Sequence, residues 1–446
     1  MFNPQIFKAY DVRGIYSDEL DGETMEKIGR SFVQFLSAKK VVVGYDMRLS
    51  SPELSAAFMR GCVKQGADVL DLGQISTDAL YFCSGKYDLP GVMITASHNP
   101  KEYNGVKFCR AGAEPIGGDS GLEQIKELVS ADNFVDAETA GVIEKKENIL
   151  KEFRDHCLKF IDKEKIKPLK IVVDAGNGMA GKVVPIIFEN LPCEIIPLYF
   201  ELDGNFPHHP SNPLEKENVL DLISKVKESG ADLGLAFDGD ADRVFFIDEK
   251  GERVDSSFAT AMIAKNLLKK NPGEKVIYTV TVSKAVPDIV EKMGSESILT
   301  RVGHSFIKEL MKKSGAIFSG EHSGHYYFRD NFRADSGIIA ALIVIEMLSE
   351  SGKKLSEFSE KFDSYHKIEE MNTQVEDKDL VIQNLKEKYG ANLTQEFDGV
   401  TFEFPDWWFN VRPSNTEPLL RLNLEANSEE LMEEKTAEVL GVMGVV

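Results

Sequence analysis

Residues 233–243 read LGLAFDGDADR, a run of apolar residues that ends abruptly in three alternating aspartates. Two further stretches follow the same plan, GVMITASHNP (91–100) and AIFSGEHSGH (316–325). In open α/β sheets, the loops at the carboxyl ends of the strands carry the ligand-binding residues. We therefore expect three related α/β units that each contribute one polar loop to a shared central cleft.

Each of these apolar runs follows an earlier strand-like run at a distance of roughly 40 to 60 residues, which leaves room for one crossover helix. The earlier runs are VVVGYD (41–46), IVVDAG (171–176) and VIYTVTVS (276–283). A charged helix is expected over 353–367, and beyond it the pattern changes to helix, strands and final helix, typical of a compact α+β domain. The predicted domains are 1–145, 146–250, 251–367 and 368–446.

Composition excludes several classes of protein. The chain of 446 residues has 42% hydrophobic residues and a formal net charge of −21, which argues against a nucleic-acid or anionic-membrane partner. An anionic substrate then requires a local concentration of cations. The five cysteines show no paired spacing, and no apolar run reaches the length of a signal peptide or a membrane span, so we expect a cytoplasmic protein. The sequence does not indicate an oligomeric state.

The loop DGDADR has the most constrained spacing. Asp238, Asp240 and Asp242 can converge on one hard cation, and oxygen ligands favour Mg²⁺ or Ca²⁺. An EF-hand is disfavoured because Arg243 stands where the sharp turn needs glycine. A phosphatase of the haloacid dehalogenase type, with Asp238 as nucleophile, stays open as an alternative, although Asp242 occupies a position where that motif has Thr or Val.

Two other loops carry groups suited to phosphate chemistry. Ser97 in TASHNP is expected on a loop, where its hydroxyl could carry a covalent group, with His98 beside it and Lys107 within reach. RPSNTEP (412–418) combines a guanidinium with short hydroxyl and amide donors, which suits a terminal phosphate. Its donors are Arg412, Ser414, Asn415 and Thr416.

GEHSGH (320–325) and DAGNGMAG (174–181) each allow two interpretations. The first presents Glu321, Ser323 and His325, which suit sugar hydroxyls, whereas a zinc site would need a further well-spaced ligand. The second contains a GxGxxG pattern after a strand-like run, as a dinucleotide site does, but close packing of a helix on a sheet requires the same small residues.

With these motifs in order, TASHNP, DGDADR, GEHSGH and RPSNTEP, the chain resembles the α-D-phosphohexomutases over nearly its full length. FKAYDVRG (7–14) is similar to the phosphomannomutase/phosphoglucomutase branch, whereas glucosamine-specific relatives tend to begin with a Gly-Thr-Asp-Gly run. The resemblance implies four domains around a central cleft, three α/β domains with mixed sheets and a smaller C-terminal α+β domain.

The resemblance also implies roles for individual residues. Ser97 matches the serine that is phosphorylated, and Asp238, Asp240 and Asp242 match the carboxylates that hold one Mg²⁺ together with it. Glu321 and Ser323 match the pair that contacts sugar hydroxyls, with His325 beside them. The substrate's own phosphate is expected at Arg412, Ser414, Asn415 and Thr416. Further matches line the site, namely Tyr10, Arg13, His98, Lys107, Arg243 and His304. Lys284 is a candidate for one more basic position, and His322 occupies a variable one.

The activity implied by the resemblance is the interconversion of hexose 1-phosphate and hexose 6-phosphate, of mannose or glucose, through phosphoserine and a hexose 1,6-bisphosphate intermediate. His98, Lys107 and Arg13 are the candidates for general acid or base, and the residues do not rank them. The alternatives are a glucosamine-phosphate mutase of the same family and the phosphatase that would use Asp238.

Overall fold

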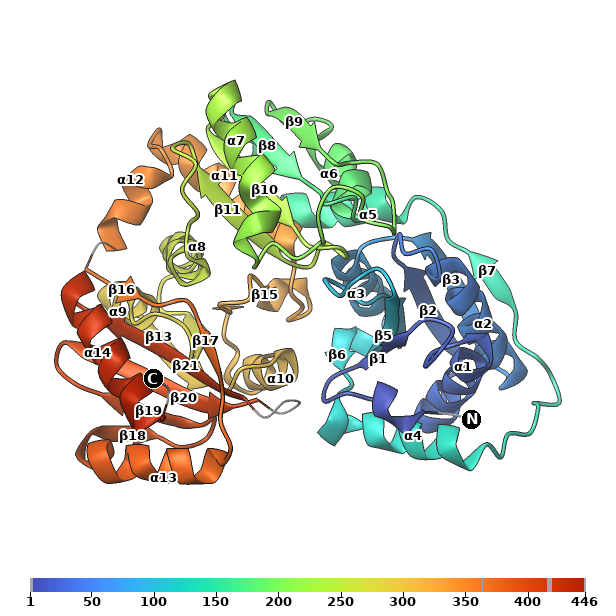
Figure 1. Cartoon of the computed structure of the whole chain (residues 1–446). Coiled ribbons are helices and arrows are strands. Elements are labelled where there is room, and N and C mark those ends of the chain that lie inside the picture. The colour runs from blue at the N-terminus through green and yellow to red at the C-terminus, as the bar shows by residue number, and fades with distance from the viewer. Residues whose placement is uncertain (1–2, 363, 415–418, 445–446) are drawn as a thin grey trace.

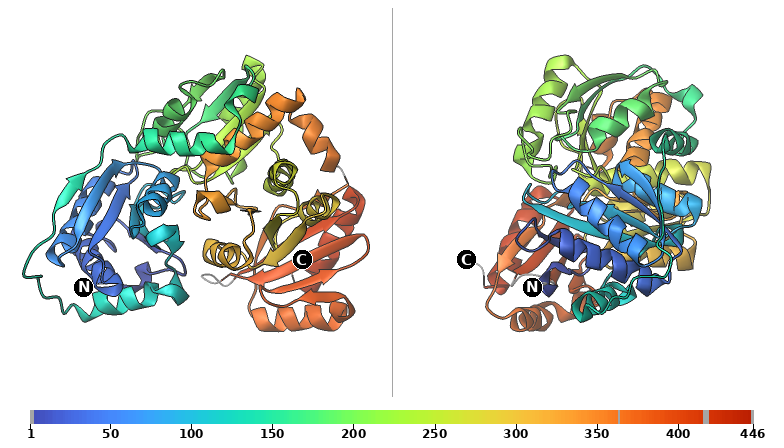
Figure 2. Two further views of the ribbon diagram at one scale, coloured as in Figure 1. Left: turned by 180° about the vertical axis from the view of Figure 1, so that it is seen from behind. Right: turned by 90° about the vertical axis from the view of Figure 1, so that its right-hand side faces the viewer.

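The structure is a computed structural model that describes residues 3–362, 364–414 and 419–444 (Figure 1). Four sheets follow one another along the chain, and none of them exchanges a strand with another. The four parts lie along an arc, with the N-terminal part and the C-terminal part at its two ends (Figures 1 and 2).

The first sheet has parallel strands at its centre and an antiparallel strand beside them. Its path is β1 (Val12–Ile15), β5 (Tyr103–Arg110), β4 (Gly91–Ile94), β2 (Lys40–Tyr45), β3 (Asp68–Gln74) and β7 (Ile143–Lys145). β2 is buried on both faces because its side chains alternate between two cores: Val41 and Val43 lie in one, and Val42 lies in the other. The main helices of this domain are α1 (Gly22–Leu36), α2 (Ser51–Lys64), α3 (Thr77–Tyr87) and α4 (Leu122–Ala131).

The second and third sheets repeat this plan with four strands each. The second runs β11 (Val244–Asp248), β10 (Leu233–Phe237), β8 (Lys170–Asp174), β9 (Glu194–Leu198), and the third runs β13 (Glu296–Thr300), β12 (Lys275–Thr279), β14 (Phe318–Gly320), β15 (Tyr326–Phe328). Their helices are α5 (Ile149–Cys157), α6 (Ala180–Phe188), α7 (Leu220–Ser229), α8 (Ser256–Lys270), α9 (Ala285–Lys292), α10 (His304–Ser314) and α11 (Gly337–Ser351).

A shared hairpin explains why the three polar loops lie at equivalent places. In each domain a parallel strand, β4, β10 or β14, is followed by a loop and by an antiparallel neighbour, β5, β11 or β15. Each loop therefore begins at the carboxyl end of a buried strand, where open α/β sheets place ligands. The predicted fold class, three α/β domains with mixed sheets, is confirmed.

The last domain has a different construction, as predicted. Its antiparallel sheet runs β16 (His366–Lys367), β21 (Leu419–Ala426), β20 (Trp407–Pro413), β19 (Val400–Glu403), β18 (Leu393–Gln395), and β17 (Met371–Gln374) also pairs with β21. Two helices complete it, α13 (Lys378–Tyr389) and α14 (Glu429–Val442). A core of its own joins these elements, so this is a separate α+β domain.

The charged helix expected over 353–367 was a wrong prediction. In the described part of that segment, α12 spans only Ser356–Ser359, a 3-10 turn covers Glu360–Phe362, and β16 follows. Beyond the 3-10 turn, the Tyr365 hydroxyl donates a hydrogen bond to Asp288 Oδ2 at 2.5 Å, and β16 joins the last sheet. The domain boundaries stay predictions, and residues 366–367 pair with the last sheet.

One core spans the first three domains. α11 is buried along most of its length and lies against β11, α8 and α5, so it joins the second domain to the third. Within the described part of the chain, every helix is too short or too polar to cross a lipid bilayer.

Candidate active site

Ser97 lies on the loop after β4, and its backbone is held in a left-handed conformation with φ of 50°. Its amide donates to Thr95 Oγ1 at 2.9 Å, which stabilises the turn. Its hydroxyl donates to Asp238 Oδ2 at 2.8 Å. His98 Nδ1 lies 3.3 Å from the Ser97 Oγ atom. The loops of the first two domains therefore meet at this hydroxyl.

Arg48 fixes the shape of the Ser97 loop from behind. Its guanidinium is completely buried and donates to four carbonyl oxygens of the loop and of the strand that follows it. The acceptors are the carbonyls of Ser97 (2.9 Å), Asn99 (2.6 Å), Pro100 (2.8 Å) and Tyr103 (2.9 Å). Arg48 was not predicted from the sequence, although it stands just after the strand-like run 41–46.

The three aspartates of the second loop converge as predicted. Carboxylate oxygens of Asp238, Asp240 and Asp242 all lie within 4.8 Å of one another, and the three side chains are buried. Among the described residues, Asp240 Oδ1 and Asp242 Oδ1 accept no hydrogen bond. Orphaned buried oxygens in a cluster of carboxylates are the chemistry that a hard divalent cation satisfies, so this donor set fits Mg²⁺.

Lys107 supplies positive charge to the same cluster. Its Nζ donates to Asp240 Oδ2 at 2.7 Å and also to Asp242 Oδ2, while Thr77 Oγ1 donates to Asp240 Oδ2 at 2.5 Å. Burial alone would lower the pKa of Lys107, but the carboxylates of Asp240 and Asp242 raise it above its ordinary value. The ammonium therefore stays charged. Burial and the neighbouring carboxylates raise the pKa of Asp238, while Lys107 holds that of Asp240 down against burial.

The third-domain loop contacts this cluster through Arg243 and His325. The Arg243 amide donates to Asp238 Oδ1 at 3.2 Å, and its Nε donates to His325 Nε2 at 3.1 Å. Because Arg243 Nε can only donate, His325 Nε2 is the acceptor, and Nδ1 carries the proton that bonds Ser323 Oγ at 2.8 Å. Burial and the Arg243 charge hold the pKa of His325 well below its usual range, so the imidazole is neutral.

Glu321 is oriented by its own domain. It accepts a hydrogen bond from the Gly303 amide at 3.0 Å and one from the Tyr327 hydroxyl at 2.6 Å. Burial raises the pKa of its carboxyl. These two bonds fix the carboxylate beside His325, whose Nδ1 is 3.7 Å from Glu321 Oε2.

Two candidate residues of the first-domain wall, Arg13 and Tyr10, have partners in different domains. Arg13 donates to the Ala96 carbonyl at 3.1 Å and to Asn99 Oδ1, and it forms an ion pair with Asp11 at 2.8 Å. Tyr10 packs edge-on against His304, with ring centroids 5.3 Å apart. Burial, with the charge of Lys308, lowers the pKa of His304 to about 4.

Asp335 and Lys308 were not predicted from the sequence. Oxygens of Asp335 and Asp242 and a nitrogen of His325 lie within 4.8 Å of one another, and Lys308 Nζ is 2.9 Å from Asp335 Oδ1. The Lys308 ammonium also lies 3.9 Å from the centre of the Tyr81 ring of the first domain. No local pattern marks these residues, because their partners come from distant segments.

In the described part of the fourth-domain loop, Arg412 has its partner within the last domain. Arg412 pairs with Glu370 at 3.0 Å, and Glu370 also accepts from Asn423 Nδ2 at 2.9 Å. Among the described residues, no hydrogen bond or ion pair links Arg412 to the first three loops. Ser414 ends the described part of this loop, and the predicted donors Asn415 and Thr416 lie outside the described residues. Lys284 instead pairs with Glu403 of the last domain.

The order of the four domains is that of one known family. The chain matches its four domain models, described as phosphoglucomutase/phosphomannomutase alpha/beta/alpha domain I (residues 4–136), domain II (150–251), domain III (255–365) and C-terminal domain (370–442). The chain belongs to the phosphoglucomutase/phosphomannomutase family.

Individual members of the phosphoglucomutase/phosphomannomutase family are similar over their whole length. A phosphomannomutase of Vibrio cholerae serotype O1 is 41% identical over 449 residues, which covers 97% of this chain and 97% of that protein. A phosphomannomutase of Methanocaldococcus jannaschii is 40% identical and covers 97% and 96%. The crystal structure of a family protein from Burkholderia thailandensis superimposes with a TM-score of 0.90 at 30% identity and covers 100% and 98%.

In this member of the family, the glycine run 176–181 is explained by close packing. A Cβ on Gly178 would lie 2.7 Å from the Gly239 carbonyl oxygen, and one on Gly181 would lie 2.1 Å from that of Phe200. Both glycines therefore let backbone segments touch, and one of those segments is the aspartate loop itself. Close packing therefore explains the GxGxxG pattern, and the pattern does not require a dinucleotide-binding site.

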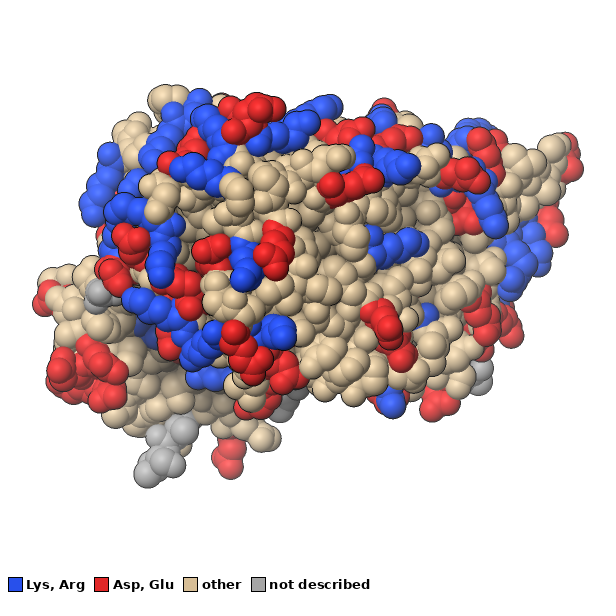
Figure 3. Space-filling model, turned by 90° about the horizontal axis from the view of Figure 1, so that it is seen from above, with Lys and Arg blue, Asp and Glu red and all other residues tan. Residues whose placement is uncertain are grey.

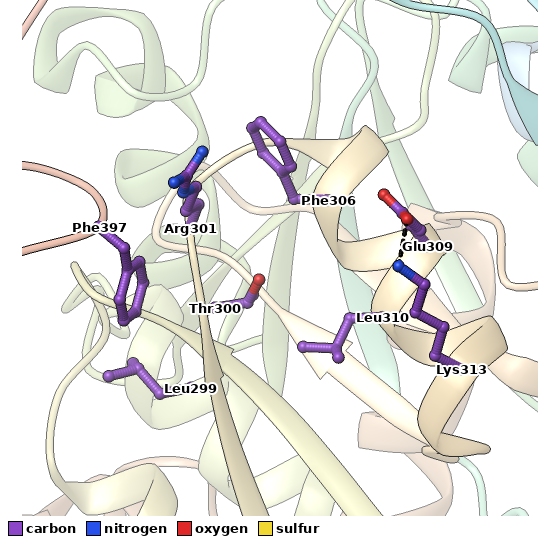
Figure 4. Close-up of a pocket in the computed structure, with 8 residues that line it drawn as sticks. All are labelled: Leu299, Thr300, Arg301, Phe306, Glu309, Leu310, Lys313 and Phe397. Atoms are coloured by element: carbon purple, nitrogen blue, oxygen red, sulfur yellow. Dashed lines mark hydrogen bonds and ion pairs between the residues drawn. The ribbon is translucent and has the colours of Figure 1, made fainter. Parts of the chain in front are cut away.

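A separate pocket of about 290 Å³ lies where the last domain approaches the third (Figure 4). Phe397 of the last domain faces the end of β13 and α10 there, and nearby the Val302 amide donates to Asp398 Oδ2 at 2.8 Å. None of the candidate site residues lines this pocket. Its position marks one of the contacts between the last domain and the third.

Proposed function

We propose that the protein is a phosphohexomutase that interconverts the 1-phosphate and 6-phosphate of mannose, glucose or both, with Ser97 as the phosphoryl carrier. The observation that carries this proposal is the 2.8 Å hydrogen bond from the Ser97 hydroxyl to Asp238, inside a cluster of three buried carboxylates. Family membership and the names of the similar proteins support the same activity.

Asp238, Asp240 and Asp242, together with a phosphorylated Ser97, are the residues that would hold Mg²⁺. A divalent cation bound there supplies charge stabilisation to a phosphoryl group in transfer. The two orphaned carboxylate oxygens support this assignment. Lys107 and Arg243 are the chain's own cations at this place, and they would balance the remaining negative charge of the phosphoserine.

In the proposed reaction, phosphorylated Ser97 gives its phosphoryl group to O6 of a hexose 1-phosphate, which forms a hexose 1,6-bisphosphate. The bisphosphate turns end for end, and the Ser97 hydroxyl takes the phosphoryl group back from O1, which leaves hexose 6-phosphate. Glu321 and Ser323 would hold sugar hydroxyls in both orientations. Arg412, with Ser414, Asn415 and Thr416, would hold the phosphate that is not reacting.

His98 is the best supported candidate for moving the proton at Ser97. Its Nδ1 lies 3.3 Å from the serine oxygen, and burial together with the charges of Arg243 and Arg13 holds its pKa well below the usual range. The imidazole is therefore neutral, which is the form that a proton acceptor must have. Lys107, by contrast, is held in its charged form, and Arg13 is engaged with Asp11, Ala96 and Asn99, so both would bind and orient phosphate.

A phosphatase that uses Asp238 as nucleophile is not favoured. One oxygen of Asp238 accepts from the Ser97 hydroxyl, and the other accepts from the Arg243 amide. The Ser97 hydroxyl is therefore held against Asp238, and the full-length relatives of 41% and 40% identity are phosphomannomutases, so Ser97 and not Asp238 is the supported phosphoryl carrier. A glucosamine-phosphate mutase is also not favoured, since the two relatives of 41% and 40% identity described above are phosphomannomutases. The predicted cytoplasmic location remains part of this proposal.

The test is a coupled assay with glucose 1-phosphate, mannose 1-phosphate and glucosamine 1-phosphate, each with Mg²⁺ and a trace of the matching 1,6-bisphosphate. We expect turnover of glucose 1-phosphate, mannose 1-phosphate or both, and phosphoryl uptake on the Ser97 peptide by mass spectrometry. Ser97→Ala should abolish both signals, and Ser130→Ala, an exposed serine of α4, should leave both unchanged. Turnover that survives in Ser97→Ala, or a phosphoryl group found on Asp238, would overturn the proposal.

A further inference from the structure

A pocket of about 240 Å³ lies in the third domain, between α8, α9, the end of α11 and the segment that leads to the last domain. None of the residues proposed for catalysis or substrate binding lines it. Its polar lining is dominated by four lysines, which we call the lysine pocket: Lys265, Lys269, Lys292 and Lys361. The remaining lining is mainly apolar and aromatic.

The four lysines have no acidic partner among the described residues. Nearby lysines do have one, since Lys270 pairs with Glu346 and Lys250 pairs with Glu360. The pocket of Figure 4 also differs, because its Lys313 is paired with Glu309 on the same helix. Lysines that lie together without a carboxylate leave a concentration of positive charge in a chain whose net charge is −21.

Mutual repulsion indicates that the ammonium groups share one space. Partial burial lowers the pKa of Lys265, and the charges of Lys361, Lys269 and Lys292 lower it further. Such repulsion is relieved when an anion binds between the groups. Figure 3 shows Lys and Arg side chains gathered on the left of the upper face, which is the side of the molecule where α12 lies.

The aromatic lining is held in place by contacts outside the pocket. Phe362 stacks on Phe258 with ring centroids 4.8 Å apart, and Tyr365 is tied to Asp288 through its hydroxyl. Phe358 completes the aromatic lining, and Lys361 lies over its ring at 4.9 Å from the centre. A pocket that combines fixed rings with several ammonium groups suits a ligand with a flat ring and more than one negative charge.

We propose that the lysine pocket binds an anion of the nucleoside diphosphate class. The base would lie against Phe358, Phe362 and Tyr365, and the two phosphates would lie among the four ammonium groups. The phosphates account for the unpaired lysines, and the base accounts for the apolar volume beside them. This site is distinct from the proposed active site and does not rest on the mutase activity.

The experiment is a calorimetric titration of the full-length protein with ADP. We expect binding that weakens at least about tenfold in the double variant Lys265→Met, Lys292→Met, because two of the phosphate partners are lost. Methionine keeps the apolar stem of each side chain, so the fold and the turnover of glucose 1-phosphate should be unchanged. The matched control is Lys386→Met, Lys388→Met in α13, which removes the same charge elsewhere and should bind ADP as the parent protein does.

Three further titrations show whether ADP binds in this pocket and which parts of the ligand the pocket holds. Arg412→Ala should bind ADP as the parent protein does. If Arg412→Ala lost ADP binding while the double variant Lys265→Met, Lys292→Met kept it, ADP would bind at the proposed phosphate loop of the substrate, and the proposal would be overturned. Pyrophosphate and adenosine should each bind more weakly than ADP. Pyrophosphate that binds as tightly as ADP would overturn the role of the rings, and adenosine that binds as tightly would overturn the role of the lysines.

Discussion

The Ser97 hydroxyl lies 2.8 Å from Asp238 Oδ2, although 141 positions of the sequence separate the two residues. The approach is possible because residue 239 is a glycine, whose Cβ would otherwise lie 2.5 Å from the Ser97 carbonyl oxygen. The backbones of two loops from two domains therefore touch. The proposed carrier and the proposed metal ligands form one site only when the first two domains are docked.

Arg48 is the residue that we expect to hold this docking in place from the first domain. In Arg48→Met, four carbonyl oxygens lose a donor and the buried Asp46 loses its countercharge, which should destabilise the protein by about 3–5 kcal/mol. The shape of the Ser97 loop should be lost as well. Thermal unfolding and phosphoryl uptake from glucose 1,6-bisphosphate measure the two effects.

Two other variants separate the loss of loop shape from general unfolding. Arg48→Lys keeps the charge but not the fork of donors, so we expect a folded protein with reduced uptake. Arg60→Met removes an exposed arginine of α2 and should change neither measurement. Full phosphoryl uptake in Arg48→Lys and in folded Arg48→Met would contradict a role of the guanidinium in shaping the loop.

Lys107 offers a prediction in which metal binding and turnover change in opposite directions. In Lys107→Met, Asp240 and Asp242 lose the ammonium that neutralises them, so Mg²⁺ should bind more tightly to the three carboxylates. Turnover should fall about 100-fold, because a cation that stabilises the transferred phosphoryl group is gone. Calorimetric titration with Mg²⁺ and the coupled assay measure the two quantities.

Lys126→Met, on the surface of α4, is the matched control and should leave both quantities as they are in the parent protein. Removal of divalent cations with EDTA should stop turnover in the parent protein, and Mg²⁺ should restore it. Weaker Mg²⁺ binding in Lys107→Met would show that the lysine supports the cation site rather than competing with the metal for the same oxygens.

The sequence predicted the positions of three loops because the information for them is local. An apolar run that stops at a polar residue marks the end of a buried strand, and Ser97, Asp238 and Glu321 each follow such a run. The order of helix-like and strand-like stretches, which is also local, predicted that the last domain is α+β and differs from the first three. Strand and hairpin patterns depend on neighbours within a few residues, so a single sequence contains them.

The supporting residues could not be predicted in the same way. Asp78 accepts a hydrogen bond from Ser336, which is 258 positions away, and neither residue stands in a distinctive pattern. Tyr365, in the segment expected to be a charged helix, bonds instead to Asp288 of α9. Such partners are fixed by the docking of domains, and a single sequence without known contacts does not specify that docking.

Arg412 is expected to act on substrate binding more than on the chemical step. In Arg412→Ala the substrate's own phosphate loses a charge-assisted hydrogen bond, so KM should rise about 10- to 100-fold. Arg412→Lys should give an intermediate KM, because a point charge replaces the planar fork. Arg329→Ala, in the third domain, is the control. Unchanged KM in Arg412→Ala would remove this arginine from the proposed phosphate loop.

Asp78 should give the stability of the protein a distinctive dependence on pH. The carboxylate is completely buried at the start of α3 and accepts from Ser76 Oγ at 2.5 Å and from Ser336 Oγ at 2.7 Å. The second bond joins the first domain to the third. Burial raises the pKa of Asp78 to about 7, whereas the unfolded chain has a value of about 3.9.

Between about pH 4 and about pH 7 the folded protein therefore keeps a proton on Asp78 that the unfolded chain has released. The free energy of unfolding should fall as the pH rises through this window, by at most about 1.4 kcal/mol per pH unit from this group. Asp78→Asn cannot ionise but still accepts from a serine hydroxyl, so this fall should disappear. The difference in Tm between Asp78→Asn and the parent protein should grow in favour of the variant from about pH 4.5 to about pH 7.5.

The control for this measurement is Asp155→Asn, an exposed aspartate of α5 that forms an ion pair with Arg154. Its Tm difference from the parent protein should stay constant over the same range of pH, because its carboxylate is hydrated in the folded and in the unfolded protein. A constant difference for Asp78→Asn as well would mean that Asp78 ionises in the folded protein at an ordinary pH. The bond to Ser336 would then join the two domains through a buried charge. The hydrogen bonds from Ser76 and Ser336, with the start of α3, would have to offset the desolvation free energy of that charge.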